Sequence, residues 1–150
     1  MEIVLTNGCD KRFISLCNQL DTCLNQLVGG EKQRTQYVQY NGLQDIHDVV
    51  LIIDEDHAVA CGSFKHYGNE EAEIKRVFVC ETYRGKKYGR MLMEKLEEIA
   101  KEKGYKRLVL ETGKTFKNAR RLYEGMGYRM IDNYGPYINL QDSICMEKLL

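Results

Sequence analysis

Residues 73–112 read EIKRVFVCETYRGKKYGRMLMEKLEEIAKEKGYKRLVLET and decide the order of the central elements. The segments 73–80 and 107–112 are typical of strands, and the stretch from Met91 to about Lys103 has apolar side chains at helical spacing. A strand, a helix and a strand joined by short connections form a right-handed crossover, in which the two strands run parallel. We therefore expect a central parallel βαβ unit.

The loop between the first of these strands and the helix combines two glycines with four cations. These residues are Arg84, Gly85, Lys86, Lys87, Gly89 and Arg90. Backbone amides at the start of a helix have no intrahelical acceptor and point outward, so such a junction suits an anion. The alternative is a solvated turn with ordinary basic residues.

The remaining elements follow from periodicity and turn residues. We expect strands at 3–5, 49–54, 58–67, 128–132 and 143–149, and helices from Asp10 to the Gly29-Gly30 pair, at 31–41 and at 116–126. The strands at 49–54 and 58–67 are expected to form a hairpin. No repeat, linker or low-complexity tract interrupts the chain, so we expect one domain spanning 1–150.

Bulk composition excludes several classes of protein. Hydrophobic residues make up 43% and charged residues 29% of the 150 residues, which is typical of a soluble globular protein. The 22 basic residues balance the 22 acidic ones, which disfavours a dedicated nucleic-acid binder. The chain has no apolar run of the ~20 residues that would cross a bilayer, and MEIVLTNGCD has no secretory pattern.

The cysteines and histidines show no metal-ligand spacing. Six cysteines contain no C-x-x-C pair, and the three histidines lie far apart in the sequence. Reduced thiols used as small apolar side chains are typical of a cytoplasmic protein. We expect a cytoplasmic protein without a metal site.

These segments together resemble the GCN5-related N-acetyltransferase (GNAT) family. The family signature begins with Arg or Gln and ends with Gly or Ala at the start of a helix, and it reads Arg84-Gly85-Lys86-Lys87-Tyr88-Gly89 here. The segment NARRLYEGMGY at 118–128 is similar to a second family segment, and the resemblance covers roughly residues 58–150. It implies the α/β GNAT acyl-CoA N-acyltransferase fold: a mixed, mostly antiparallel sheet around a parallel βαβ unit, with splayed strands and helices on both faces.

Lys87 departs from the family pattern. It stands where many members have glycine, whose missing Cβ allows a ligand to approach the backbone closely. The backbone amides can still face a phosphate there, provided that Lys87 has ordinary helical dihedrals.

The resemblance implies that acetyl-CoA is the donor and that no metal takes part. It assigns cofactor binding to the following residues: Phe78, Val79, Arg84, Gly85, Lys86, Lys87, Tyr88, Gly89, Arg90 and Asn118. The amides from Gly85 to Arg90 would bind the pyrophosphate. The end of strand 73–80 would splay from strand 107–112, so that backbone groups near Phe78 and Val79 bind the pantetheine arm and polarise the thioester.

Several residues near the expected last helix have two interpretations. Asn118 would contact the cofactor, or it would satisfy free amides at the helix start. The nearby cations would extend a positive field toward the adenosine 3′-phosphate, or they would be plain helix surface; they are Lys114, Lys117, Arg120 and Arg121.

The resemblance also implies direct attack of a primary amine on the thioester in a ternary complex, with Tyr123 as the general acid for the leaving thiolate. Tyr123 also shares a helix face with apolar residues, which would make it a core tyrosine. Glu73 is the candidate base, and Glu111 is the reserve. The alternative for Glu73 is a structural ion pair with Lys75 or Arg76. Strand alternation predicts that Glu73 and Lys75 share one face, unless a bulge intervenes.

The expected function is therefore N-acetylation of a small-molecule amine, with a protein or peptide acetyltransferase and a non-catalytic acyl-CoA sensor as alternatives. Nucleic-acid binding is disfavoured because no aromatic platform accompanies the basic loop. The loop at 134–143 would line the acceptor site, or it would be a solvent-facing connection. The resemblance favours a homodimer, because members of the family are often dimers. Cys80 or Cys145 as a nucleophile is disfavoured, because neither has a local context that lowers a thiol pKa.

Overall fold

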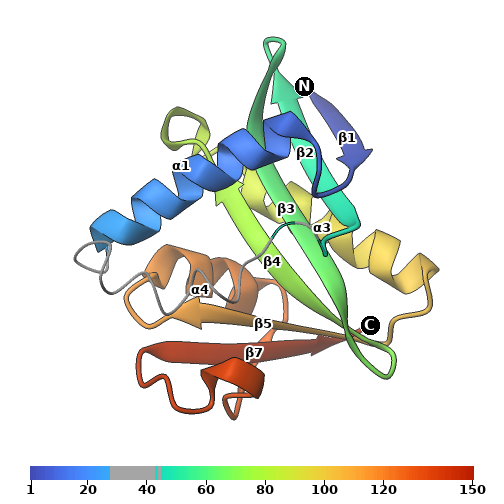
Figure 1. Ribbon diagram of the computed structural model, residues 1–150, viewed down its shortest axis with the longest axis vertical. Coiled ribbons are helices and arrows are strands. Elements are labelled where there is room, and N and C mark those ends of the chain that lie inside the picture. Colours follow the sequence, from blue (N-terminus) through green and yellow to red (C-terminus); the bar gives the residue numbers. More distant parts are fainter. Residues whose placement is uncertain (28–42, 44) are drawn as a thin grey trace. The chain divides into compact units, whose positions relative to one another are not determined.

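The computed structural model describes residues 1–27, 43 and 45–150 (Figure 1). The strands are β1 Glu2–Thr6, β2 Asp48–Asp54, β3 His57–Gly68, β4 Glu71–Val79, β5 Arg107–Gly113, β6 Arg129–Ile131 and β7 Ser143–Leu149. The helices are α1 Lys11–Leu27, α3 Tyr88–Glu102 and α4 Lys117–Gly125, with short 3₁₀ turns η1 Glu81–Tyr83 and η2 Gly135–Tyr137. The expected strands and three of the expected helices are confirmed. The helix expected at 31–41 lies outside the described residues.

Within the described part of the chain, seven strands form a mixed sheet in the order β1-β2-β3-β4-β5-β7-β6. Strands β4 and β5 pair parallel, with Glu71–Glu73 beside Arg107–Val109, so the predicted βαβ unit is confirmed. The pairs β1–β2, β2–β3, β5–β7 and β6–β7 are antiparallel. No helix among the described residues is long and apolar enough to cross a membrane.

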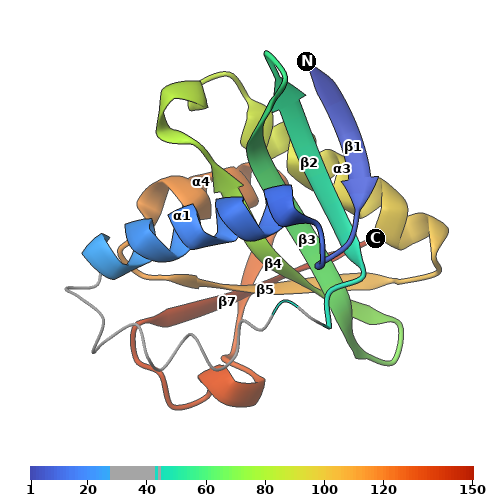
Figure 2. The ribbon, with the colours of Figure 1, turned by 45° about the horizontal axis from the view of Figure 1, so that its top comes forward.

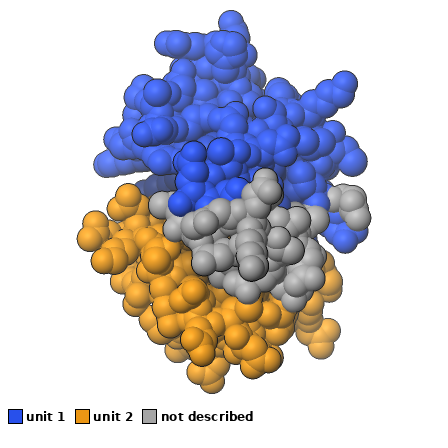
Figure 3. Space-filling model, turned by 60° about the vertical axis from the view of Figure 1, so that its left-hand side comes forward, with its two compact units in different colours: residues 1–65, 75–96 blue, residues 66–74, 97–150 orange. Residues whose placement is uncertain are grey.

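The chain forms two compact units, shown in blue and orange in Figure 3. The first comprises residues 1–65 and 75–96, and the second comprises residues 66–74 and 97–150. Strand β4 passes from the second unit to the first between Ile74 and Lys75. The slot expected where β4 and β5 diverge involves both units, and it stays a prediction.

The first unit has helices on both faces of its strands. Figure 2 shows α1 lying across β2 and β3. Its residues Phe13, Leu16 and Cys17 share a core with Cys61 of β3 and Phe78 of β4. Gly62, the next residue of β3, faces α3: a Cβ there would come within 2.9 Å of the Leu96 side chain. Adjacent strand residues point to opposite faces, so α1 and α3 cover the two sides.

Strand β4 has an irregular backbone at Arg76, whose φ is +59°. The left-handed φ interrupts the extended conformation, so the alternation expected from Glu73 onward does not run unbroken along the strand. The Arg76 guanidinium pairs with Asp21 of α1 at 2.5 Å, and the Arg76 carbonyl oxygen lies 3.3 Å from the Cys61 thiol. The Ser63 hydroxyl donates to the Lys75 carbonyl at 2.5 Å. Strand β3 and α1 therefore hold β4 at the irregularity.

Candidate functional site

In the first unit, the loop before α3 presents a row of free backbone donors. Among the described residues, the amides from Gly85 to Arg90 donate no hydrogen bond, and the first bonded amide after them is that of Met91, which donates to the Lys87 carbonyl. Gly85 and Lys87 have φ values of +83° and +66°. Alternating left- and right-handed residues turn successive N–H groups toward one side, which creates a concave anion site. The helix dipole adds positive potential there.

Ordinary helical dihedrals at Lys87 were the condition stated for amides that face a phosphate. That condition was wrong, because Lys87 does not have helical dihedrals and, among the described residues, the amides are free. Its φ of +66° lies in the left-handed region, which glycine adopts without penalty and other residues rarely adopt. The family's glycine at this position therefore matches a backbone requirement, and Lys87 meets that requirement despite its side chain.

Four side-chain contacts hold this loop in place. Arg84 Nε donates to the Val79 carbonyl at 2.9 Å, and its guanidinium lies 5.8 Å from the centre of the Phe78 ring. The Tyr88 hydroxyl donates to Asp54 at 2.6 Å, and this hydrogen bond raises the pKa of Tyr88. The Tyr83 and Tyr88 rings stack 6.5 Å apart. The loop is thus tied to the end of β4 and to the β2–β3 hairpin.

Lys86 and Arg90, two further cations of the loop, make different contacts. Lys86 Nζ lies 5.1 Å from the centre of the Tyr83 ring, and Arg90 pairs with Glu94 at 3.0 Å on the exposed surface of α3. Phe78 is buried in the core, where it fixes the end of β4, and Val79 is half-buried. The sequence predicted the loop, but it did not predict the contact of Arg84 with Val79 or that of Tyr88 with Asp54.

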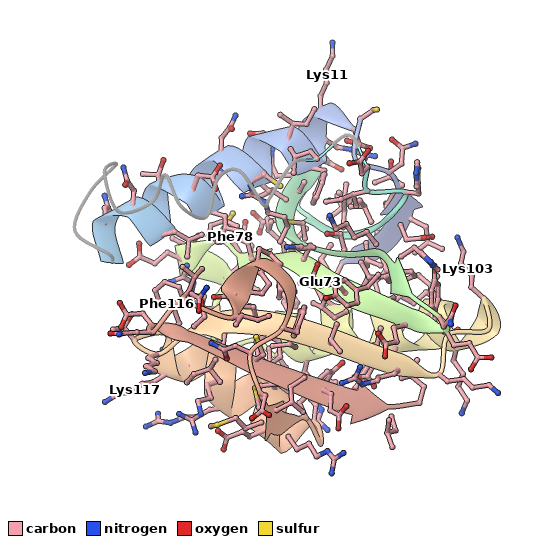
Figure 4. The ribbon with its side chains drawn as sticks, turned by 60° about the horizontal axis from the view of Figure 1, so that its bottom comes forward. Lys11, Glu73, Phe78, Lys103, Phe116 and Lys117 are labelled. Atoms are coloured by element: carbon pink, nitrogen blue, oxygen red, sulfur yellow. The ribbon has the colours of Figure 1, made fainter. Side chains whose placement is uncertain are left out.

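In the second unit, Glu73, which is labelled in Figure 4, is 4% exposed. Its carboxylate accepts a hydrogen bond from the Tyr134 hydroxyl at 2.7 Å. Tyr137 interacts with the same carboxylate, and it is buried. The Tyr134 and Tyr137 side chains of the segment around η2 therefore reach Glu73, whereas Gly135, Pro136 and Ile138 are exposed. The role of the segment at the acceptor site stays a prediction. Arg76, one of the two partners considered for Glu73, forms an ion pair with Asp21. An ion pair of Glu73 with Lys75 or Arg76 stays an open alternative.

Tyr123 lies on α4 with 7% of its surface exposed. Its ring meets the Tyr128 ring edge-on at 5.9 Å, and its hydroxyl has no hydrogen-bond partner among the described residues. Burial, with the charge of Glu111, raises the pKa of Tyr123 well above its usual value, so the phenol stays protonated. Glu111 accepts a hydrogen bond from the Ser143 hydroxyl at 2.6 Å. The Tyr123 ring is thus part of the core, and its hydroxyl group is available as a hydrogen-bond donor.

The other candidates of this unit lie on the exposed side of α4. Asn118 is the second residue of the helix; it is exposed and caps no amide among the described residues, so the capping alternative is not observed. Arg120 pairs with Glu124 at 2.7 Å, and Lys117 is exposed. The contact of Asn118 with a cofactor stays a prediction.

The surroundings of the two cysteines considered as nucleophiles raise their thiol pKa values and so disfavour the thiolate form. Burial raises the pKa of the half-buried Cys80 thiol. Burial, together with the charges of Glu111 and Glu73, raises the pKa of Cys145 to about 11. A thiol is the weaker nucleophile, so an acyl-enzyme on either residue is not favoured.

Comparison with known proteins identifies the family. The sequence pattern of the acetyltransferase (GNAT) family matches residues 15–128. The chain belongs to the GNAT acetyltransferase family. The resemblance seen in the sequence is thereby confirmed, and the chain is an acetyl-CoA-dependent N-acetyltransferase of this family.

Two curated GNAT relatives show how far the similarity extends. The IAA acetyltransferase of Azospirillum brasilense is 32% identical over 142 residues, which cover 91% of this chain and 90% of that protein. The uncharacterized N-acetyltransferase YsnE of Bacillus subtilis is 31% identical over 97 residues, which cover 63% of this chain and 64% of that protein. The similarity to YsnE therefore spans just under two thirds of its length.

Solved structures confirm the GNAT fold. A crystal structure from Klebsiella pneumoniae, assigned to the acyl-CoA N-acyltransferases, superposes with a TM-score of 0.80 at 29% identity and covers 99% of this chain and 97% of that one. A GNAT acetyltransferase of Elizabethkingia anophelis with acetyl-CoA bound has a TM-score of 0.64 at 23% identity, covering 77% of this chain and 82% of that one. The predicted fold class is correct.

Proposed function

We propose that this GNAT enzyme transfers the acetyl group of acetyl-CoA to a primary amine of a small molecule by direct attack in a ternary complex. The observation that carries the proposal is the row of free backbone amides from Gly85 to Arg90. Consecutive N–H groups with a left-handed residue at Gly85 and another at Lys87 fit a diphosphate better than a single-charge ligand, because several oxygens can be bound at once.

The residues of the first unit would hold the donor. The amides from Gly85 to Arg90 would bind the diphosphate, and Lys86, Lys87 and Arg90 would add charge around it. Backbone groups at Phe78 and Val79 would bind the pantetheine arm and stabilise the oxyanion that forms during attack. Asn118 would make a further contact with the donor.

The residues of the second unit would handle the protons. Glu73 would accept the proton that the amine loses as its nitrogen bonds to the acetyl carbon. Tyr123 would donate its proton, or a hydrogen bond, to the sulfur as the C–S bond breaks. The inward position of Tyr134 and Tyr137 supports the interpretation that the 134–143 segment lines the acceptor site.

Three further features complete the proposal. The similarity to an IAA acetyltransferase over nine tenths of the chain supports a small-molecule acceptor. The six cysteines are free thiols, which supports a reducing, cytoplasmic location. The family match draws on residues of both compact units, which supports one GNAT domain spanning 1–150.

Donor binding is tested with a series of truncated ligands. Acetyl-CoA at 100 times its Kd is expected to raise the Tm by about 5–10 °C. Acetyl-pantetheine, which lacks the diphosphate, is expected to bind at least about 100-fold more weakly, because several charge-assisted hydrogen bonds are lost. If free phosphate stabilises the protein and acetyl-CoA does not, the loop is a plain anion site and the donor assignment is wrong.

A pair of variants tests the amides themselves. Gly89→Pro removes one N–H in the first turn of α3, where proline is tolerated, whereas Gly89→Ala keeps that N–H. We expect the Kd for acetyl-CoA to be about 10- to 100-fold higher in Gly89→Pro than in Gly89→Ala. Equal Kd values in two folded variants would contradict binding through this amide.

The acceptor is tested by a screen with acetyl-CoA and amino acids, polyamines and aminoglycosides. Products should be followed by mass spectrometry, because the six protein thiols give background in thiol-release assays. Turnover of small amines supports the proposal. Binding of acetyl-CoA without turnover of any amine, peptides included, would indicate a non-catalytic sensor instead.

A further inference from the structure

The carboxylate of Glu73 is held by a phenol from a distant part of the chain. Tyr134 lies 61 residues after Glu73, yet its hydroxyl donates to Glu73 Oε2 at 2.7 Å. Glu73 is 4% exposed, and Tyr137 interacts with the same carboxylate. A buried carboxylate is costly unless hydrogen bonds stabilise its charge, and phenols supply such bonds without adding a positive charge.

The backbone around Tyr134 is itself well anchored. The Tyr137 amide donates to the Tyr134 carbonyl at 2.9 Å. The side-chain amide of Asn133 donates to the carbonyls of Tyr137, Leu140 and Ser143 at 3.1, 3.3 and 3.2 Å. These bonds close the segment on itself, so the position of the Tyr134 hydroxyl is set by a folded turn.

The Tyr134 ring is also fixed on both sides. It meets the Tyr67 ring edge-on at 5.1 Å and the Tyr137 ring edge-on at 5.5 Å. Gly135 has a φ of +53°, and a Cβ there would come within 3.0 Å of the Tyr67 hydroxyl. A glycine next to Tyr134 thus allows the turn to approach Tyr67 closely, and the phenol is held against Glu73 by packing as well as by its hydrogen bond.

We propose that Tyr134 is a positioning residue for the general base: its hydroxyl orients the Glu73 carboxylate and keeps it ready to accept the proton of the acceptor amine. This inference rests on the proposed function. The amine N–H bond breaks, the proton bonds to a Glu73 oxygen, and Tyr134 keeps its own proton throughout. Burial, together with the charge of Glu73 and the hydrogen bond to it, raises the pKa of Tyr134 far above its usual value. The phenol is therefore a donor at every working pH.

The test compares Tyr134→Phe with Tyr67→Phe. Both variants remove one hydroxyl from the same ring cluster and keep the rings, but among the described residues the Tyr67 hydroxyl makes no hydrogen bond. The profile of kcat against pH is measured with acetyl-CoA and two acceptors from the amine screen whose amine pKa values differ. A limb that belongs to the acceptor moves between the two amines, whereas a limb that belongs to the enzyme does not.

We expect Tyr134→Phe to move the enzyme's acidic limb to higher pH by about one unit, because a carboxylate that loses a donor keeps its proton to higher pH. Tyr67→Phe should leave that limb in place, and Glu73→Gln should abolish it. If the acidic limb stays in place in a folded Tyr134→Phe variant, this inference is wrong and the proposed function is unaffected. A wild-type protein that turns over no amine overturns the proposed function and this inference with it.

A measurement without turnover covers the case in which Tyr134→Phe does not fold. In Tyr137→Phe protein labelled with ¹³Cζ-tyrosine, Tyr134 is the phenol still bonded to Glu73, and its signal should shift as the pH falls and the carboxylate takes up a proton. That shift should be absent in Glu73→Gln. Tyrosine signals with the same pH response in both proteins would overturn the inference.

Discussion

At the scale of single residues, Lys87 shows how a backbone requirement can be met by an unfavourable residue. Its φ of +66° places a Cβ where glycine would have none, at a cost of about 1–2 kcal/mol. The neighbouring Lys86 is not among the residues with a positive φ. The two lysines therefore offer a matched pair with the same charge and different backbones.

We expect Lys87→Gly to be more stable than Lys87→Ala by about 1 kcal/mol, because both lose the charge and only alanine keeps the strained Cβ. For Lys86 the order should reverse, with glycine less stable than alanine by a few tenths of a kcal/mol to about 1 kcal/mol. Urea unfolding of the four variants measures both differences. The same order at the two positions would contradict a strained Lys87.

At Tyr123, the contribution of the hydroxyl can be tested separately from that of the ring. Tyr123→Phe should lower kcat about 100-fold, because the thiolate loses its donor, and should change stability by less than about 0.5 kcal/mol. Tyr128→Phe is the control: its hydroxyl donates to Glu97 at 2.9 Å, so we expect a loss of about 1 kcal/mol in stability and little change in kcat. Full activity in Tyr123→Phe would remove Tyr123 from the acid role.

At the scale of elements, ion pairs around one buried carboxylate of the second unit join β5, β6, β7 and the first residues of β4. Arg107 of β5 bonds Glu147 of β7 and Glu71 of β4, each at 2.5 Å. Arg129 of β6 also bonds Glu147. These arginines, Arg107 first, hold the pKa of Glu147 below its usual value. The buried Glu147 carboxylate is thus paired with arginines, whereas the buried Glu73 carboxylate of the candidate site is bonded by a tyrosine.

We expect Arg107→Ala to lower the free energy of unfolding by about 2 kcal/mol, because two carboxylates lose a partner and Glu147 is buried. Arg129→Ala should cost about 0.5 kcal/mol, since its side chain is 73% exposed. Chemical denaturation at neutral pH measures both. Equal losses of unfolding free energy in the two variants would contradict the expectation that the less exposed arginine contributes more.

At the scale of the whole molecule, the six thiols differ in access. Cys9 is exposed, Cys23 and Cys80 are half-buried, and Cys17, Cys61 and Cys145 are buried. We expect a disulfide reagent to modify Cys9 rapidly in the native protein, Cys23 and Cys80 slowly, and the other three only on unfolding, because reaction needs both access and a thiolate. Peptide mapping after timed labelling checks this order. Rapid labelling of Cys61 in native protein would contradict it.

The strands, the helices and the parallel pair could be predicted because each depends on a local pattern. Apolar side chains repeat with the period of the element that buries them, and glycines mark the ends. The bounds were less accurate: α3 begins at Tyr88, three residues before the predicted Met91, and β4 begins at Glu71 rather than at Glu73. Gly89 and Arg90 add no apolar side chain to the helical repeat, so periodicity placed the start of the helix after them.

The sequence by itself determined the family, the order of elements and the loop with its free amides, because these depend on the backbone and on residues close together in the chain. Only the tertiary structure decided which side chains meet. Tyr134 reaches Glu73 across 61 residues, Tyr88 reaches Asp54 across 34, and Arg107 reaches Glu147 across 40. A hydrogen bond at such a separation leaves no periodic trace in a sequence, since it exists only after the elements between its partners have packed.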